Sequence, residues 1–239
     1  GENNENRQLF GVMFGYMNGG HSVKGINNTS TSGDNDIYSL GLYGTWLENK
    51  AGDSQDYVDT WVQYLWSRNE MKGQYIDEKY NAGGWAASIE LGRTKKIDES
   101  GERQYFIEPK AQLTWNNFSQ DSVDWQMDGG SINRFEQKTS NQLTSRLGLR
   151  FVSRQNDSEV KYKKDNSFLE LNWLHNFKEY EFKLGGNDLK MGQSNVFEVK
   201  AGYEKQFNEK YSLWLNGFIQ LGSNEYRSFG TQLGVKYTF

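Results

Sequence analysis

The C-terminal stretch 226–239 constrains the fold more than any other part of the chain, because it alternates strictly between two kinds of residue. Most odd positions are apolar or aromatic, and the even positions are small or polar. The two rows are Phe229, Thr231, Leu233, Val235, Tyr237 and Phe239 against Ser228, Gly230, Gln232, Gly234, Lys236 and Thr238. This period of two predicts a β-strand with one apolar and one polar face. The apolar face can pack inside a soluble protein, or it can contact lipid while the polar face lines a lumen.

About ten segments repeat this alternation, and no segment of comparable length shows a helical stripe. We expect strands over 8–18, 37–49, 56–69, 81–93, 104–118, 140–153, 166–178, 195–207, 210–222 and 226–239. Sequential strands with local connections predict an all-β antiparallel, up-and-down arrangement. Pro109 lies on the apolar side of its segment and predicts a bulge or a missing ladder bond there.

The links between these segments alternate in length. Long polar loops are expected over 19–36, 70–80, 119–139 and 179–194, whereas most other links read as short turns, including a charged turn over Lys95 to Arg103. The charged turn 154–165 is longer, and the last link is short and breaks the series. Long loops outside and short turns in the periplasm are typical of outer-membrane barrels. The pattern places both chain ends on the periplasmic side.

Composition excludes several other classes of protein. The 239 residues contain no Cys and only two His, His21 and His175, which gives no thiol chemistry, no disulfide framework and no zinc site. A mean hydropathy of −0.88 and the absence of a run of about 20 apolar residues exclude a helical membrane protein. The net charge of −4 indicates no nucleic-acid partner. We expect no metal and no cofactor.

The polar rows carry charges of both signs. The ten candidates for lumen-lining charges are Glu90, Glu108, Lys110, Arg146, Arg150, Glu170, Glu198, Lys200, Glu204 and Lys236. Together they predict a hydrated or plugged lumen, because burying so many charges in a dry core is costly. A soluble β-sandwich, the alternative fold, would have to turn this face to solvent.

The apolar rows are almost free of charge away from their ends. Arg93 and Lys205 interrupt them, but both lie near predicted periplasmic turns, where long side chains reach the interface. Aromatic residues at the strand ends predict two interfacial girdles: Tyr57, Trp66, Tyr105, Trp115, Phe177, Phe207, Tyr237 and Phe239. We therefore favour a transmembrane antiparallel β-barrel over 8–239. Residues 1–7 are expected to be disordered or a linker remnant, and we interpret the chain, which begins at Gly1, as a piece of a longer secreted precursor.

Several separate motifs, in one order, resemble the autotransporter β-domain, and most closely the group of the adhesin involved in diffuse adherence. They are GVMFGY (11–16), YSLGLYGTW (38–46), YVDTWVQYLW (57–66), GGWAASIELG (83–92), FIEPKAQLTW (106–115), FLELNWLHN (168–176) and GVKYTF (234–239). The resemblance implies a monomeric outer-membrane barrel of a Gram-negative bacterium, the translocator of type V secretion. It also implies outer-membrane lipid and an N-terminal passenger as partners.

The resemblance further implies a twelve-stranded barrel threaded by a preceding pore helix. The match begins at the family's third strand, so the pore helix and the first two strands are not in this sequence. Either the chain closes as a smaller barrel, or its free edges meet a partner; we favour a truncated or shared barrel, because a barrel left open exposes unpaired backbone groups to lipid. The β-barrel assembly machinery is one candidate partner.

The last strand also fits the C-terminal signal that the outer-membrane insertase reads. The positions that carry this signal are Gln232, Gly234, Tyr237 and Phe239. Two other functions remain as alternatives, a passive porin and a barrel that cleaves its own passenger. Cleavage would use inward acidic residues such as Glu90, Glu108, Glu170 and Glu204. We expect no enzyme activity, because lumen carboxylates also serve plain solvation.

Overall fold

The fold is described from a computed structural model. The structure describes residues 6–24, 30–50, 54–73, 76–126, 132–137, 140–155, 165–178, 180–184, 187–208, 210–223 and 225–237. Phe239 of the predicted C-terminal signal, residues 1–5 of the predicted linker remnant and most of the turn 154–165 lie outside these ranges.

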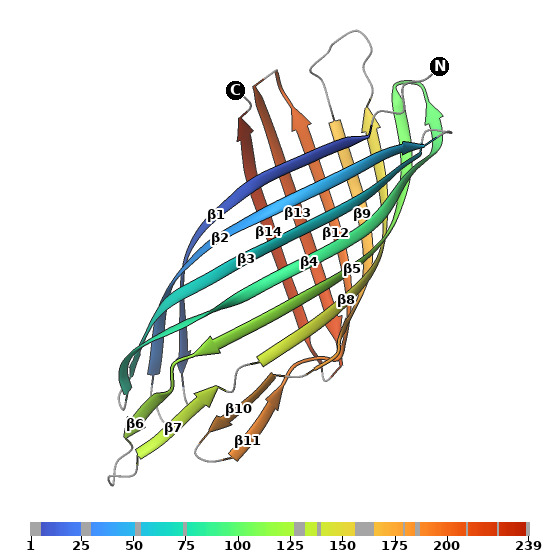
Figure 1. Cartoon of the computed structure of the whole chain (residues 1–239). Helices are drawn as coiled ribbons and strands as arrows, with labels where there is room; N and C mark the ends of the chain where they lie inside the picture. The colour runs from blue at the N-terminus through green and yellow to red at the C-terminus, as the bar shows by residue number, and fades with distance from the viewer. Residues whose placement is uncertain are drawn as a thin grey trace.

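Ten strands form one antiparallel sheet in which neighbours in sequence are neighbours in space (Figure 1). Its strands, in order, are β1 (Arg7–Lys24), β2 (Ser30–Lys50), β3 (Ser54–Gly73), β4 (Ile76–Ser100), β5 (Arg103–Gln120), β8 (Ser140–Gln155), β9 (Asp165–Asn176), β12 (Asn195–Gln206), β13 (Tyr211–Gly222) and β14 (Arg227–Tyr237). The predicted all-β, antiparallel, up-and-down fold is confirmed. Among the described strands, β1 and β14 are the two edges of the sheet and do not pair with each other.

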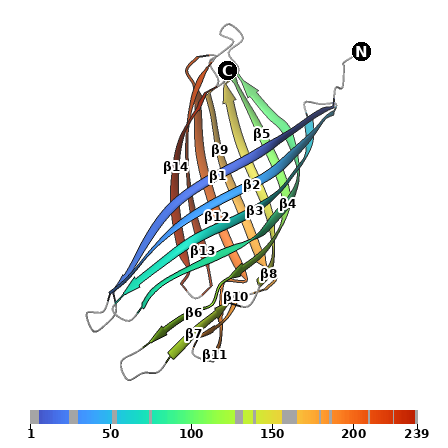
Figure 2. The ribbon, with the colours of Figure 1, turned by 60° about the vertical axis from the view of Figure 1, so that its left-hand side comes forward.

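The sheet curls strongly, so that β1–β4 cross in front of β9, β12, β13 and β14, and the sheet encloses a space (Figure 2). β1 begins and β14 ends at the same end of the sheet (Figure 1). The large apolar side chains point away from the enclosed space: Phe14 is 73% exposed, Phe229 is 84% exposed and Val199 is 45% exposed. A soluble sandwich would bury these side chains, so the curled sheet excludes that alternative. Among the described residues, there is no helix with the length and apolar character needed to cross a membrane.

Several strands are longer than predicted, and three of the expected links are much shorter. The β1–β2 ladder continues to Lys24 opposite Ser30, and the β3–β4 ladder continues to Gly73 opposite Ile76. The loops expected over 19–36 and 70–80 were therefore wrong over most of their length. Likewise, β4 and β5 extend through the expected charged turn and leave only 101–102, where Gly101 has φ +59°. Pairing between strands satisfies the backbone N–H and C=O groups whatever the side chains are. A strand can therefore continue into a polar segment that has no alternating apolar row.

A second, four-stranded sheet lies at the end opposite the two termini (Figure 1). It consists of β6 (Val123–Gln126), β7 (Ile132–Gln137), β10 (Tyr180–Leu184) and β11 (Asn187–Met191), in the order β11-β10-β7-β6. These strands lie inside the long loops expected over 119–139 and 179–194, where the sequence analysis predicted no strands. The two loops meet where β10 pairs with β7, with Phe182 opposite Gln137.

Pro109 interrupts one ladder without changing its register. The β4–β5 pairing stops at Gly92 opposite Lys110 and resumes at Lys95 opposite Ile107, whereas Pro109 stays paired with β8. The missing ladder contacts agree with the loss of a backbone donor at proline. The register shift in this hairpin lies elsewhere, at Ile97.

Aromatic rings cluster on the outer face near both ends of the strands. Near the second sheet, Tyr38 stacks on Trp66 with ring centroids 5.7 Å apart, and near the termini Phe10 contacts Trp46 edge-on at 5.4 Å. Tyr57 was wrongly assigned to this outer girdle. Its hydroxyl donates a hydrogen bond to Glu90 on the opposite, inner face (2.9 Å).

The two charged residues that interrupt the outer rows near the termini have acidic partners. Arg93 donates two hydrogen bonds to Asp56, one of them from Nη2 at 2.8 Å. Lys205 Nζ lies 4.0 Å from Asp165 Oδ2. Both pairs lie close to strand ends, as the interfacial interpretation requires.

Candidate functional site: the lumen face

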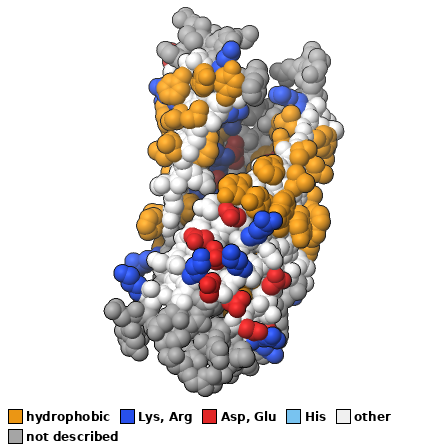
Figure 3. All heavy atoms as spheres, turned by 90° about the vertical axis from the view of Figure 1, so that its left-hand side faces the viewer, with side chains coloured by type: hydrophobic (Ala, Val, Ile, Leu, Met, Phe, Trp, Pro, Cys, Tyr) orange, Lys and Arg blue, Asp and Glu red, His pale blue; other side chains and the backbone are white. Residues whose placement is uncertain are grey.

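The concave face of the ten-stranded sheet, which we call the lumen face, carries the inner rows of all ten strands. Because side chains alternate between the faces, residues two apart on one strand share this face. In the space-filling view, charged side chains lie in the hollow between two walls whose outer surfaces are largely apolar (Figure 3). The candidate site is the network of charges on the central strands of this face.

Lys110 on β5 lies at the centre of the network. Its Nζ is 2.8 Å from Glu170 Oε1 on β9 and 3.9 Å from Glu90 Oε2 on β4. The Glu170 residue is only 4% exposed. Burying a carboxylate costs several kcal/mol unless it is paired, so these contacts compensate its desolvation. Lys110 thus links β5 to β9 across the intervening strand β8, and it also lies near β4.

Asn172 joins Glu170 to Glu198 on the neighbouring strand. Its Nδ2 donates to Glu170 Oε1 at 2.8 Å and to Glu198 Oε1 at 3.0 Å. Glu198 also accepts a hydrogen bond from Gln220 Nε2 (2.7 Å), and Lys200 Nζ lies 3.2 Å away. Each of these two carboxylates, on β9 and β12, is therefore held by short contacts from at least two donors.

Glu108 forms the part of the network nearer the termini. It is 7% exposed and accepts a hydrogen bond from Thr94 Oγ1 at 3.0 Å. Arg154 Nη2 lies 3.4 Å from its Oε1, and Arg150 Nη1 lies 3.8 Å from its Oε2. Each arginine also lies over an aromatic ring.

The structure brings most of the predicted lumen-lining charges into contact. The residues that it joins are Glu90, Glu108, Lys110, Arg146, Arg150, Glu170, Glu198 and Lys200. Glu204 and Lys236 lie on the same rows but outside this network, and neither has an ion pair within the described ranges. Their proposed role as lumen-lining charges stays a prediction.

Sequence reasoning did not single out several polar members of the network. These are Thr94, Arg154, Asn172 and Gln220, and Tyr57 was assigned to the outer girdle instead. A usable signal was spacing: Asn172 is two positions from Glu170, so both share the lumen face. Uncharged donors beside buried carboxylates are expected, because each ionised carboxylate accepts several hydrogen bonds.

The residues of the predicted insertase signal lie on the edge strand β14. Gly234 is opposite Trp214 on β13, and Tyr237 is opposite Tyr211, with ring centroids 5.0 Å apart. These contacts give Gly234 and Tyr237 structural roles in the last hairpin. Their recognition by an insertase stays a prediction, as does the role of Phe239, which is outside the described residues.

No group of three or more His, Cys, Asp or Glu side chains that could hold a metal ion occurs within the described ranges. The charged groups that contact one another on the lumen face are carboxylate, ammonium and guanidinium groups. Such a surface can bind and orient a polar or charged chain segment.

A curled antiparallel sheet with an apolar outer face and a charged inner face defines a membrane-embedded β-barrel domain. The family model described as the autotransporter beta-domain matches residues 3–217, and the chain belongs to this family. The domain is the outer-membrane translocator of Gram-negative bacteria. The family resemblance seen in the sequence is therefore confirmed.

Relatives with similar sequences and structures support the same assignment. The chain is 34% identical to the uncharacterized protein YuaQ of Escherichia coli (strain K12), over 98% of this chain and 18% of that protein. It is 33% identical to YdeU of the same organism, over 99% of this chain and 52% of that protein. The chain thus spans about a fifth and about half of the length of these relatives.

Among solved structures, the chain is similar to the transport unit of the autotransporter AIDA-I from Escherichia coli. The TM-score is 0.83 at 27% identity, over 97% of this chain and 76% of that structure. The similarity extends through nearly the whole ten-stranded sheet.

Proposed function

We propose that this chain is the main part of a translocator whose lumen holds the segment that connects the barrel to an N-terminal passenger outside the cell. The chain would act as a monomer that anchors the passenger in the outer membrane. The family assignment implies an attached passenger. The threaded segment, the export of the passenger and its adhesive character are parts of the proposal.

The position of the chain ends is the observation that carries this proposal. β1 begins at the end of the sheet where β14 finishes (Figure 1). In outer-membrane barrels the longer connections face outwards, and here the connections that carry the second sheet lie at the opposite end. An even number of strands added before β1 would return the chain to the same end. A passenger outside the cell must therefore connect through the lumen, and a charged, hydrated lumen face suits a polar segment.

Epitope accessibility on intact cells tests this arrangement. An epitope inserted between Lys24 and Ser30 should bind antibody on intact cells, whereas one placed just before Arg7 should bind only after permeabilisation. The passenger of the full precursor should be accessible on intact cells. A passive porin would show the same accessibility of the barrel epitopes but no surface-exposed passenger upstream. A passenger confined to the periplasm would contradict the proposal.

We also propose that the β-barrel assembly machinery recognises β14 through Gln232, Gly234, Tyr237 and Phe239. The support is that β14 is an edge of the sheet, with one side unpaired among the described strands. An unpaired strand edge is a template for adding another strand. Removing Phe239 should slow assembly in cells without lowering the stability of protein refolded in detergent.

Finally, we propose that the barrel does not cleave its passenger. Of the four acidic candidates, Glu90, Glu108 and Glu170 are each hydrogen-bonded and next to a cation, and Glu204 lies outside this network. These hydrogen bonds and ion pairs hold the carboxylates against neighbouring strands, so they serve as structural links within the sheet. A precursor that is processed with Glu170 present and left intact by Glu170→Gln would overturn this part of the proposal.

A further inference from the structure

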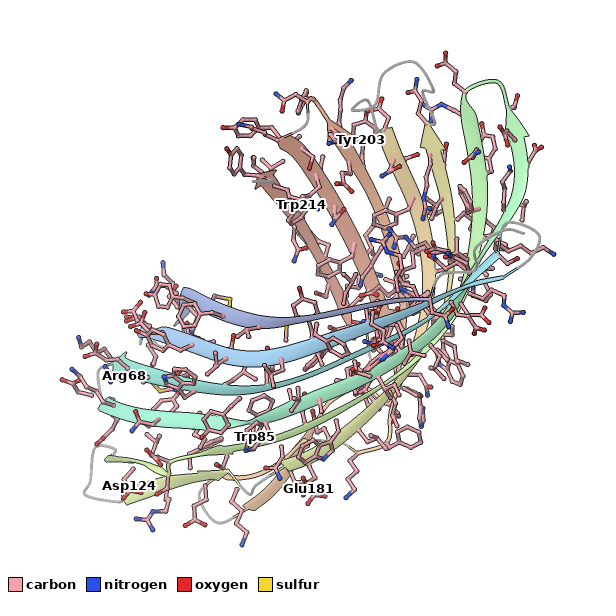
Figure 4. The ribbon with its side chains drawn as sticks, turned by 45° about the horizontal axis from the view of Figure 1, so that its top comes forward. Arg68, Trp85, Asp124, Glu181, Tyr203 and Trp214 are labelled. Atoms are coloured by element: carbon pink, nitrogen blue, oxygen red, sulfur yellow. The ribbon has the colours of Figure 1, made fainter. Side chains whose placement is uncertain are left out.

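A cavity on the lumen face contains more positive than negative side chains. Its volume is about 370 Å³, and its charged lining consists of Lys110, Arg146, Arg150 and Lys200 with only Glu170 and Glu198. It lies over β5, β8, β9, β12 and β13 and reaches Gln232 on β14. In Figure 4 the side chains of these strands converge on the space enclosed by the curled sheet.

The carboxylates next to Arg146 and Arg150 lie beyond hydrogen-bonding distance of their guanidinium groups. Arg146 Nη2 is 3.8 Å from Glu198, and Arg150 is 3.8 Å from Glu108 and 3.9 Å from Glu170. Glu170 and Glu198 instead make their short contacts with other donors. The Nε atoms of both arginines are buried and have no hydrogen-bond partner among the described residues.

Unpaired guanidinium donors are costly away from water, because a buried polar group without a partner loses its hydration. Arginine presents its donors as a rigid planar fork that matches a carboxylate. Arg150 is also oriented in advance: its Cζ lies 4.0 Å from the centre of the Phe168 ring. That ring lies against Gly202, where an added Cβ would come within 2.2 Å of it.

We propose that Arg146 and Arg150 form a carboxylate-binding pair, and that they bind two acidic side chains of the passenger-linked segment in the lumen. The inference rests on the proposed function, since it names the chemistry of the segment that the lumen holds. A carboxylate accepts the two parallel N–H bonds of a guanidinium group. The surplus of positive charge in the cavity selects an acidic partner over a basic one.

The spacing of the arginines fixes the spacing of their partners. Four residues of strand span about 13 Å, and a strand tilt of about 40° reduces this to about 10 Å along the barrel axis. A helix rises about 1.5 Å per residue, so that distance corresponds to about seven residues, or two turns. Two acidic residues about seven positions apart on one helical face would therefore meet both arginines.

Arginine modification by phenylglyoxal, read by mass spectrometry, tests the pair in the isolated chain. The probe is a synthetic helical peptide with two Glu residues about seven positions apart, and its control has Gln at both positions. We expect the Glu peptide to slow labelling of Arg146 and Arg150 about tenfold, as a strong charge-assisted pair would. Arg103, which donates to Ser153 Oγ at 3.0 Å, should label at an unchanged rate.

Two results in this experiment would overturn the proposal. One is equal labelling with both peptides. The other is equal protection by acetate at the same carboxylate concentration, which would mean a general anion site without a preferred segment.

Variants of the full precursor provide a second test. Arg146→Gln combined with Arg150→Gln should lower the heat resistance of the precursor by more than that of the isolated chain, because the partner segment is present only in the precursor. Arg154→Gln is the matched control: it is on the same strand and row, but Arg154 pairs with Glu108 outside the cavity lining. Equal effects in precursor and isolated chain would overturn the proposal. If the wild-type passenger never reaches the surface, the proposed function fails, whereas the peptide experiment still reports on the arginine pair.

Discussion

At the scale of single residues, several glycines on the lumen face lie directly opposite an aromatic ring on the neighbouring strand. Trp214 covers Gly234, where an added Cβ would be 2.3 Å from Cε2 of the indole. The other pairs are Gly11 with Tyr43, Gly92 with Tyr57, Gly202 with Phe168 and Gly230 with Phe218. Glycine at these places lets a large ring lie flat against the sheet.

This arrangement predicts that Gly234→Ala destabilises the folded protein. The ring of Trp214 would have to move, and overpacking of this kind costs about 1–3 kcal/mol. Chemical unfolding in lipid or detergent measures the change. Gly217→Ala is the matched control, since its added Cβ would have no neighbour closer than 3.8 Å. The cost of Gly234→Ala should shrink when Trp214 is also replaced by Ala; an undiminished cost would show that the indole is not the cause.

The side-chain faces could be predicted from the sequence, but the contacts between them could not. Alternation placed Glu170, Asn172 and Glu198 on one face, yet the sequence does not contain the register that puts Asn172 between the two carboxylates. For Tyr57 the prediction of the face itself was wrong, although the alternation in the sequence was sufficient to assign it. It was read as an outer aromatic because of its residue type, whereas its odd position in 56–69 already placed it with the inner row.

At the scale of the element, each strand has one row for lipid and one for the lumen, and the rows should respond differently to charge. Leu147 and Val199 lie on the outer row and are 52% and 45% exposed. Arg at either position should cost about 2–4 kcal/mol near the bilayer midplane. Gln112, which donates to Ser88 Oγ on the lumen face, is the control, and Gln112→Arg should cost far less. Equal costs by unfolding in lipid vesicles would show that the faces are assigned wrongly.

The second sheet is held in part by an exposed ion pair whose pH dependence can be predicted. Arg134 donates to both carboxylate oxygens of Asp124, at 2.7 and 2.9 Å. This hydrogen bonding lowers the pKa of Asp124. Since the pKa is lower in the folded protein, the pair stabilises this sheet above the ordinary Asp pKa of about 3.9 and loses that effect as the pH falls.

Carboxyl NMR titration measures this shift. Arg134→Leu should return the pKa of Asp124 towards its ordinary value, and added salt should reduce the shift because the pair is exposed. Arg134→Lys keeps the positive charge but not the two parallel donors of the guanidinium group. It should restore part of the lowering of the Asp124 pKa. An unchanged pKa in Arg134→Leu would assign the shift to another group.

The element bounds also show what a local pattern cannot predict. The extensions of β1–β4 have no apolar row, because a paired polar strand outside the membrane needs none. The second sheet depends on pairing between two loops about 45 residues apart, and such non-local pairing leaves no periodic signal in either loop.

At the scale of the whole molecule, the unpaired edges of the sheet decide how the barrel is completed. Open edges in lipid cost several kcal/mol for each unsatisfied group. The described strands β1 and β14 form separate edges, and 24% of the AIDA-I transport unit lies outside the matched region, since the match covers 76% of that chain. That transport unit therefore contains additional chain beyond the part that matches the ten-stranded sheet. Direct closure of ten strands would instead give a narrower lumen, because barrel diameter grows with strand number.

A cysteine scan distinguishes the two arrangements. Cysteines placed singly at 12–16 on β1 should not form disulfides with cysteines placed at 231–235 on β14 in the isolated chain, because the two edges do not pair. Leu215→Cys with Leu233→Cys is the positive control, since these residues are directly opposite on β13 and β14 and paired positions lie within disulfide reach. Efficient cross-linking between β1 and β14 within one chain, at the level of this control, would establish a closed ten-stranded barrel and refute a shared or completed edge. If the edges cross-link to added strands from the precursor but not to each other, the lumen has the width that a threaded segment requires.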